Sequence, residues 1–175
     1  MKELPVFKYH PNPIETKSFH YGKEKCDCCG KETDIYYQAP FYGDREISAL
    51  CPFCISNGKA AEKFMGVFVE INENTISDNK AIDELAKRTP GYCGSLDEAW
   101  LIHCDDFCSF HGNVNNSDIL IEKMNDFADL KNDIEDICND TEDLIVKIDN
   151  GEVVGYLFQC LHCKKYLFRV EVYHY

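Results

Sequence analysis

Apolar residues recur at steps of three and four over residues 117–138, and this spacing predicts an amphipathic helix. The remaining positions of the segment are largely acidic, as in a helix face turned to solvent. The predicted apolar stripe consists of Leu120, Met124, Phe127, Leu130, Ile134 and Ile137.

A second helix is predicted from cap and stop signals. Ser77 or Asp78 can cap its first turn, and Ile82 and Leu85 share one of its faces. Residues 88–91, Arg-Thr-Pro-Gly, end it because proline cannot continue a helix.

Two further segments have shorter helical patterns. Residues 57–64 predict a short helix, and residues 96–107 predict a helix that carries Trp100. Cys104 and Cys108 would then lie one turn apart on one helical face.

Strand patterns occupy the rest of the chain. Residues 33–42 are rich in Ile, Tyr and Phe, and residues 166–175 predict a strand near the end. Residues 144–148 and 152–159 flank Asp-Asn-Gly, a sequence typical of hairpin turns. Residues 4–13 contain three prolines and predict an extended arm.

The 11 cysteines raise the question of compartment. Residues 1–9 contain no apolar leader, and no apolar stretch approaches membrane-spanning length, so we expect a cytoplasmic protein without membrane insertion. In a reducing cytoplasm, paired cysteines more often bind metal or perform redox chemistry than form structural disulfides.

Two Cys-x-x-Cys pairs have the spacing of a zinc ribbon. Cys26 and Cys29 precede a glycine, and Cys51 and Cys54 follow 21 residues later. These four thiols predict one zinc site, with Cys28 as a bystander. The alternative, a thioredoxin-like redox pair at Cys51 and Cys54, leaves the first pair unexplained.

A second zinc ion is predicted from Cys160 and Cys163 at a hairpin tip, together with Cys104 and Cys108. Three histidines are alternatives to Cys108 as the fourth ligand: His103, His111 and His162. Cys93 and Cys138 are interpreted as ordinary thiols, since free cysteine behaves as a small hydrophobic residue.

These elements predict an α+β fold, in one zinc-stabilised domain over residues 1–175. Residues 26–64 form a small zinc-ribbon-like module with short strands, and residues 77–138 are expected to be mostly helical. Residues 144–175 are expected to form a β-hairpin that carries the second zinc knuckle.

Charge limits the class of partner. The chain has 18 basic and 31 acidic residues, a net charge of −13, and residues 116–152 alone contribute −9. Two four-thiolate zinc sites would take the total to about −17. Such a polyanion repels phosphate backbones, so we expect a protein partner and no nucleic acid. The acidic segment is either a solvated face or a docking surface for a basic partner.

The leading functional hypothesis is a zinc-stabilised interaction protein that presents residues 88–92 and the N-terminal arm as its binding surface. An alternative is a metal-dependent enzyme with a site near His103, Asp106 and Arg88, although the chain has none of the common catalytic-zinc or nucleophile motifs. A weaker alternative is a thiol-based redox sensor that releases zinc on oxidation.

Several short motifs, in one order, are similar to those of the CbrC family of uncharacterised bacterial proteins, named for a member linked to colicin tolerance. They occupy residues 4–11, 26–30, 37–42, 50–55, 88–92, 100–104 and 157–163. The resemblance implies a role in stress or toxin tolerance and no particular reaction. Two positions differ from the family: Lys164 where Gly is usual, and Phe53 where Trp is usual.

Overall fold

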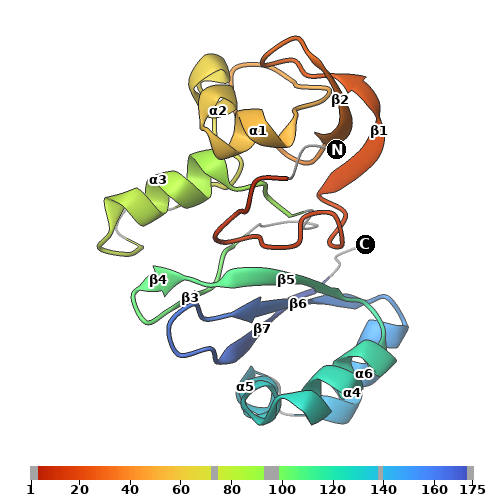
Figure 1. Cartoon of the computed structure of the whole chain (residues 1–175). Helices are drawn as coiled ribbons and strands as arrows, with labels where there is room; N and C mark the ends of the chain where they lie inside the picture. Colours follow the sequence, from red (N-terminus) through yellow and green to blue (C-terminus); the bar gives the residue numbers. More distant parts are fainter. Residues whose placement is uncertain (1–3, 72–74, 93–98, 138–139, 173–175) are drawn as a thin grey trace.

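The computed structural model describes residues 4–71, 75–92, 99–137 and 140–172. Within these ranges the chain has the expected α+β structure, with small antiparallel sheets and short helices (Figure 1). A ribbon module, residues 19–64, lies at the top of the view, a three-stranded sheet lies below it, and three helices cover the far side of that sheet.

The ribbon module begins with two antiparallel strands, β1 (Phe19–Lys25) and β2 (Glu32–Tyr37). The sequence pattern did not predict β1. The strand predicted over residues 33–42 ends at Tyr37, and Tyr42 instead forms an isolated bridge with Val67. The module is zinc-ribbon-like because its first cysteine pair forms the turn between β1 and β2.

Two short helices follow the second cysteine pair of the ribbon module. They are α1 (Pro52–Ser56) and α2 (Lys59–Phe64). The helix predicted over residues 57–64 corresponds to α2, which begins two residues later than predicted, and α1 was not predicted. Gly58 separates the two helices with a φ of 76°, a conformation that glycine adopts without strain.

The helix α3 (Asn79–Arg88) confirms the prediction made from its caps. The carboxylate of Asp78 accepts a hydrogen bond of 2.8 Å from the amide of Lys80. At the other end, the hydroxyl of Thr89 donates to the carbonyl of Glu84 at 3.0 Å.

Much of the binding surface expected from residues 88–92 and the N-terminal arm is buried, although Arg88 is exposed and Val6 of the arm is 90% exposed. Thr89 and Tyr92 are at most 1% exposed. Phe7, Tyr9 and His10 of the arm are at most 2% exposed. The large aromatic side chains of both segments pack into the core that joins the ribbon module to the sheet.

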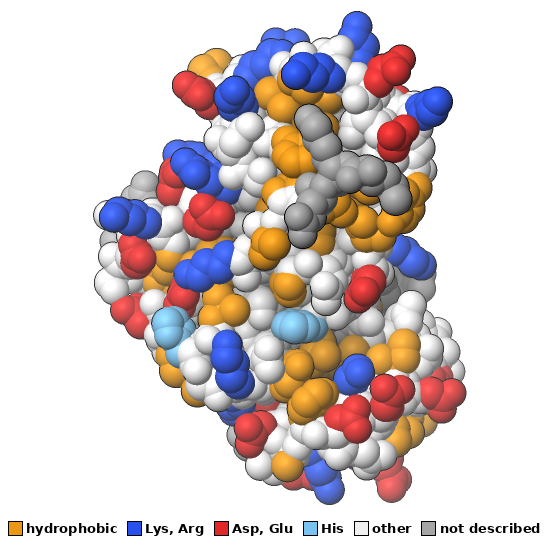
Figure 2. All heavy atoms as spheres, viewed as in Figure 1, with side chains coloured by type: hydrophobic (Ala, Val, Ile, Leu, Met, Phe, Trp, Pro, Cys, Tyr) orange, Lys and Arg blue, Asp and Glu red, His pale blue; other side chains and the backbone are white. Residues whose placement is uncertain are grey.

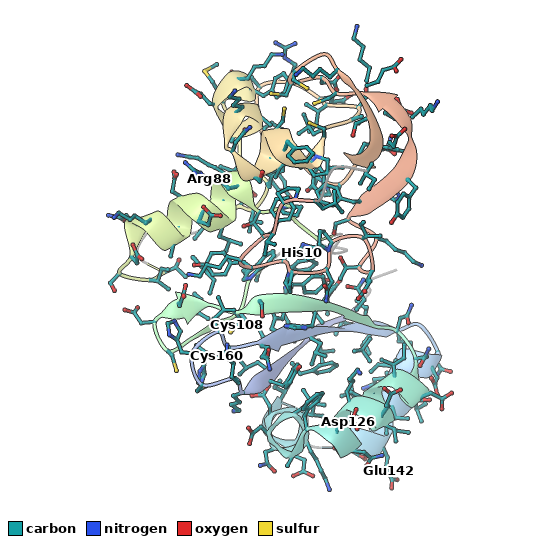
Figure 3. The ribbon with its side chains drawn as sticks, viewed as in Figure 1. His10, Arg88, Cys108, Asp126, Glu142 and Cys160 are labelled. Carbon is teal, nitrogen blue, oxygen red and sulfur yellow. The ribbon has the colours of Figure 1, made fainter. Side chains whose placement is uncertain are left out.

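His10 lies between β5 and the ribbon module (Figure 3). Its Nδ1 donates to the carbonyl of Pro90 at 2.8 Å, since a carbonyl can only accept, and its Nε2 then accepts from the hydroxyl of Thr16 at 2.6 Å. Burial lowers the pKa of His10 to about 4, so this imidazole is neutral at pH 7.

The helix predicted over residues 96–107 is wrong where the structure describes it. Residues 102–107 form a hairpin of β3 (Ile102–His103) and β4 (Asp106–Phe107). Cys104 and Asp105 form its two-residue loop, with φ values of 54° and 56°. Two positive φ values are typical of a type I′ turn, which fits the twist of paired strands.

The central sheet has the order β5 (Ser109–Val114), β6 (Val153–Gln159) and β7 (Tyr166–Val172), all antiparallel. Alternate residues of β6 enter different cores. Tyr156 belongs to the core beneath the ribbon module, and Leu157 belongs to the core beneath the helices. Because both faces are covered, nearly all of β6 is buried.

The helical layer consists of α4 (Ser117–Asp126), α5 (Ala128–Ile137) and α6 (Thr141–Asp149). The single helix predicted over residues 117–138 breaks at Phe127, whose backbone is extended. Leu130 and Ile134 of the predicted stripe are still buried after the break, whereas Ile137, the last residue of α5, is 49% exposed. No helix in the described ranges is both long and apolar enough to cross a membrane.

The strand predicted over residues 144–148 is also wrong, because these residues lie in α6. Asp140 caps this helix by accepting from two backbone amides. Gly151 ends it with a φ of 71° and donates its amide to the carbonyl of Ile148 at 3.0 Å. The hairpin that does form, between β6 and β7, has the second cysteine pair in its turn, as predicted.

Candidate metal centres

Two groups of four side chains bring metal-ligand atoms together in the part of the chain that the structure describes. Within each group, all ligand atoms lie within 4.8 Å of one another. The first group is Cys26, Cys29, Cys51 and Cys54, and the second is His103, Cys104, Cys160 and Cys163.

The first group matches the predicted zinc-ribbon set. In its first knuckle, the amide of Cys26 donates to the carbonyl of Lys31 at 3.0 Å. The amide of Gly30 donates to the carbonyl of Cys26 at 2.7 Å, with Gly30 at a φ of 71°. The amide of Cys51 then donates to the sulfur of Cys26 at 3.2 Å, which joins the two knuckles.

Two residues that the sequence analysis did not single out support the first group. A carboxylate oxygen of Asp27 accepts from the amides of Ser48 at 2.7 Å and Ala49 at 3.2 Å, just before the second knuckle. The ammonium of Lys63 donates to the carbonyls of Asp27 and Cys28 at 2.8 and 2.5 Å. An acidic residue inside a Cys-x-x-Cys turn was the available signal for Asp27, whereas nothing local indicated Lys63.

Cys28 lies outside the group of four, on the half-buried side of the first knuckle. Burial raises the pKa of its thiol, and a contact with the sulfur of Cys54 only partly opposes this. Cys28 is therefore a thiol next to the first group without being one of its four donors.

The second group is assembled from two hairpin turns. The β6–β7 turn repeats the geometry of the first knuckle: the amide of Cys160 donates to the carbonyl of Lys165 at 2.9 Å, and the amide of Lys164 donates to the carbonyl of Cys160 at 3.2 Å. Lys164 has a φ of 65° and takes the place that Gly30 has in the first knuckle. The β3–β4 hairpin supplies His103 and Cys104.

The spacing of the donor atoms fits a tetrahedral zinc ion. Zinc bond lengths imply sulfur–sulfur separations of about 3.8 Å and sulfur–nitrogen separations of about 3.6 Å around one ion. The sulfurs of Cys29 and Cys51 are 4.0 Å apart. The Nδ1 atom of His103 is 3.2 Å from the sulfur of Cys104 and 3.4 Å from that of Cys163.

The structure does not place Cys108 in the second group. The prediction that Cys104 and Cys108 share a helical face is wrong, because the chain turns through a hairpin at Cys104 and continues as strand. The side chain of Cys108 is fully buried in the core, and burial raises its pKa to about 12. His103 takes the fourth position in its place.

The other two histidine alternatives have different partners. His111 shares a hydrogen bond of 3.0 Å with the hydroxyl of Ser109. The Nε2 atom of His162 lies 3.1 Å from a carboxylate oxygen of Asp106. Cys93 and Cys138, which were interpreted as ordinary thiols, lie outside the described residues.

Asp106 links the second group to the N-terminal arm. Besides His162, it accepts from the hydroxyl of Tyr9 at 2.7 Å and from the ammonium of Lys8 at 3.0 Å. Burial acts to raise the pKa of Asp106, but these three hydrogen bonds outweigh it and lower the pKa. An ionised, fully partnered carboxylate positions neighbouring groups, and it is poorly suited to act as a free general base.

The two groups differ in exposure. Cys26, Cys51 and Cys54 of the first group are buried, whereas only Cys160 is buried in the second. Burial acts to raise the pKa of Cys160, but the amides of Cys163 and His162 overcome this and lower it to about 6. The lowered pKa of Cys160 favours its thiolate, the form in which cysteine binds metal.

The residues of the enzyme hypothesis do not form one site. Arg88 lines a surface depression of about 510 Å³ next to α2 and α3, together with Gly58 and Met65. None of the residues lining this depression belongs to either cysteine group or to the Asp106 network. Figure 3 shows Arg88 beside the ribbon module and Cys160 at the central sheet.

Comparisons with known proteins place the chain in a family. The model of the uncharacterised protein family UPF0167 matches residues 4–172. UPF0167 proteins of Mycobacterium bovis and Mycobacterium tuberculosis are each 33% identical over 172 residues, covering 95% of this chain and 92% of theirs. A UPF0167 protein of Pseudomonas aeruginosa is 30% identical over 173 residues, covering 91% of this chain and 92% of its own. No solved structure matches the chain. The chain therefore belongs to UPF0167, a family of uncharacterised proteins with bacterial members.

Proposed function

We propose that this protein binds two zinc ions in closed structural sites and acts through contacts with another protein. The observation that carries the proposal is the composition of the two groups, which have four sulfurs in one and three sulfurs and an imidazole in the other. Soft thiolate and imidazole donors favour zinc over magnesium or calcium. Four protein donors complete a tetrahedron, which favours a structural site over a catalytic one.

The two ions would hold together segments that are far apart in the sequence. The first joins the β1–β2 turn to the start of α1, and the second joins the β3–β4 hairpin to the β6–β7 turn. Zinc binding contributes on the order of 10 kcal/mol to the folding of small thiolate modules. Because one hydrophobic core contains both Phe7 and Cys160, we propose that residues 1–175 form a single zinc-stabilised domain.

Zinc analysis with matched variants tests this proposal. The purified chain should contain two zinc ions, and Cys29→Ser and His103→Ala should each retain one. Cys28→Ser and Cys108→Ala should retain both, because neither removes a proposed donor. A chain without zinc would refute the proposal, and a His103→Ala variant with two ions would refute the assignment of the fourth donor.

The helical layer is the proposed partner surface. Figure 2 shows acidic side chains gathered over the part of the molecule where this layer lies, and Figure 3 places Asp126 and Glu142 on it. Three apolar side chains are exposed on the same layer: Ile121, Ile137 and Val146, at 42%, 49% and 55%. Apolar residues among acidic ones suit a partner that presents basic and apolar side chains, and the net charge of −13 disfavours nucleic acid.

Charge neutralisation at two places tests the partner surface. A triple variant, Asp126→Asn, Asp129→Asn and Glu142→Gln, should reduce the cross-linking of a basic partner in extracts of the native cell. A control variant removes three charges from the ribbon module instead, with Glu24→Gln, Glu32→Gln and Glu46→Gln. Equal cross-linking by both variants would refute the assignment to the helical layer.

The similarity to the CbrC family suggests the cellular context, namely tolerance of a toxin or another stress. We propose that the chain acts there as a binding protein in the cytoplasm, where its thiols remain reduced. The metal-dependent enzyme is the less favoured alternative, because Asp106 is fully partnered and Arg88 lies at a different surface.

A further inference from the structure

The second group is far more open to solvent than the first. Cys104 and Cys163 are both exposed, and they lie at the tips of two different hairpins. Their sulfurs are within 4.8 Å of each other. We propose that Cys104 and Cys163 are a hydroperoxide-reactive pair, and that their oxidation to a disulfide releases the zinc ion of the second site.

Exposure as a pair distinguishes these two sulfurs from the other five cysteine sulfurs of the two groups. A hydroperoxide must reach a sulfur to react, and susceptibility follows thiolate character and access. In the first group, Cys26, Cys51 and Cys54 are between 0% and 8% exposed, so Cys29 lacks an accessible partner sulfur among the other three donors. Cys160 of the second group is fully buried, which leaves Cys104 and Cys163 as the only exposed pair within either group.

The reaction is balanced with a hydroperoxide as the oxidant. One of the two thiolates attacks the peroxide oxygen, forming an S–O bond while the O–O bond breaks and releases hydroxide. The other thiolate then attacks that sulfur, forming the S–S bond and releasing a second hydroxide. Both hydroxides take protons from solvent, so two thiolates and one hydrogen peroxide yield one disulfide and two water molecules. Two electrons pass from sulfur to peroxide, and zinc leaves unchanged as Zn²⁺.

The loss of these two donors leaves His103 and Cys160 at the second site, too few to retain a structural zinc ion. The new disulfide still joins the β3–β4 hairpin to the β6–β7 turn, so the fold need not open. Trp100 can report the change, because its indole donates to the carbonyl of Cys108 at 2.6 Å, just beyond β4.

This inference rests on the zinc occupancy proposed above, and the experiment separates the two. The zinc content of the full chain is measured first, and fewer than two ions would refute the proposed function. The loaded chain is then treated with hydrogen peroxide while released zinc is followed with a colorimetric chelator. We expect one ion to leave, and the second to leave at least about tenfold more slowly.

Peptide mapping after thiol blocking identifies the reacting sulfurs without any substitution at a ligand. We expect a disulfide between Cys104 and Cys163. Cys26, Cys51 and Cys54 should carry the blocking group, which shows that they were free thiols after peroxide treatment. The Cys28→Ser variant should release zinc at the same rate, because Cys28 belongs to neither group. Equal release of both ions, or a disulfide that joins Cys160 to Cys163 instead, would overturn the proposal.

Discussion

The two knuckles have different residues, Gly30 and Lys164, at the same left-handed backbone position, and this difference predicts how substitutions there change stability. Gly30 and Lys164 follow the last cysteine of their knuckles with φ values of 71° and 65°. A residue with a Cβ atom is strained in this left-handed region by about 1 kcal/mol, whereas glycine is not. Lys164 therefore carries a local cost that the first knuckle avoids.

Three variants isolate this cost. Lys164→Ala and Lys164→Gly both remove the contact of the lysine ammonium with the carbonyl of Leu161, and they differ only in the Cβ atom. Lys164→Gly should be more stable than Lys164→Ala by about 1 kcal/mol. Gly30→Ala should cost a similar amount through conformation alone, because the nearest atom to its new Cβ would be 4.0 Å away, on Lys25.

Urea unfolding at a fixed excess of free zinc measures these differences, with the single tryptophan, Trp100, as the fluorescent probe. The free zinc concentration must be held constant, because bound metal adds to the stability of every variant. If Lys164→Gly were no more stable than Lys164→Ala, strain at the second knuckle would be refuted. If Gly30→Ala were as stable as wild type, the conclusion that a Cβ atom is strained at position 30 of the first knuckle in the same way as at position 164 of the second would also be refuted.

Three other predictions concern the core and the metals. Because burial lowers the pKa of His10 to about 4 from 6.5, its neutral form stabilises the fold above pH 6.5, and this contribution of about 3 kcal/mol is lost as the pH falls towards 4. Unfolding of a His10→Asn variant should show a smaller loss over that window, and equal slopes would contradict the assignment. Gly155→Ala should destabilise by more than about 2 kcal/mol in urea unfolding, because its Cβ would lie 2.1 Å from the ring of Phe168. Removal of zinc with a strong chelator should lower the melting temperature, and added zinc should restore it; unchanged melting would contradict a structural role.

The elements that could be predicted from the sequence have strong local signals. The helix α3 has a capping Asp78 and a stop before Pro90, and the structure confirms both ends. The cysteine pairs at 26–29 and 160–163 were predictable because a knuckle needs only a tight turn. In each case the residues that determine the structure are neighbours in the chain.

The elements that were predicted wrongly have signals that fit two structures. The triplet Asp-Asn-Gly before β6 suits a hairpin turn, but a glycine in the left-handed region also ends a helix, and here it ends α6. Asp140 at the start of that helix was the distinguishing signal, since its side chain caps the first turn. Residues 117–138 read as one helix because the apolar spacing does not reveal the extended backbone at Phe127.

The fourth donor of the second site could not be derived from spacing, because it depends on the shape of the loop around Cys104. On a helix, Cys104 and Cys108 would lie on the same face. In the observed hairpin, His103 ends β3 directly before the two-residue turn and Cys104 is the first residue of that turn, whereas Cys108 lies beyond β4 in the core. The type I′ conformation needs positive φ at Cys104 and Asp105, and cysteine is not a residue that signals such a turn.

The positive φ at Cys104 means that contacts around the turn are needed to hold the second site together. A cysteine in the left-handed region costs about 1–2 kcal/mol, so surrounding contacts must hold the turn in place. The backbone of Asp105 also has a positive φ and adds to the strain. Its carboxylate, however, accepts a hydrogen bond of 2.5 Å from the hydroxyl of Ser77, beside the start of α3. Next to it, Asp106 binds the N-terminal arm on one side and His162 on the other. Two adjacent aspartates thus connect the turn to the segment before α3, to the N-terminal arm and to the β6–β7 turn. Asp105→Ala and Asp106→Ala should therefore weaken zinc binding at the second site while leaving the first site unchanged. A competition titration against a zinc chelator measures this, and equal weakening of both sites would show that the aspartates support the whole fold instead of one metal centre.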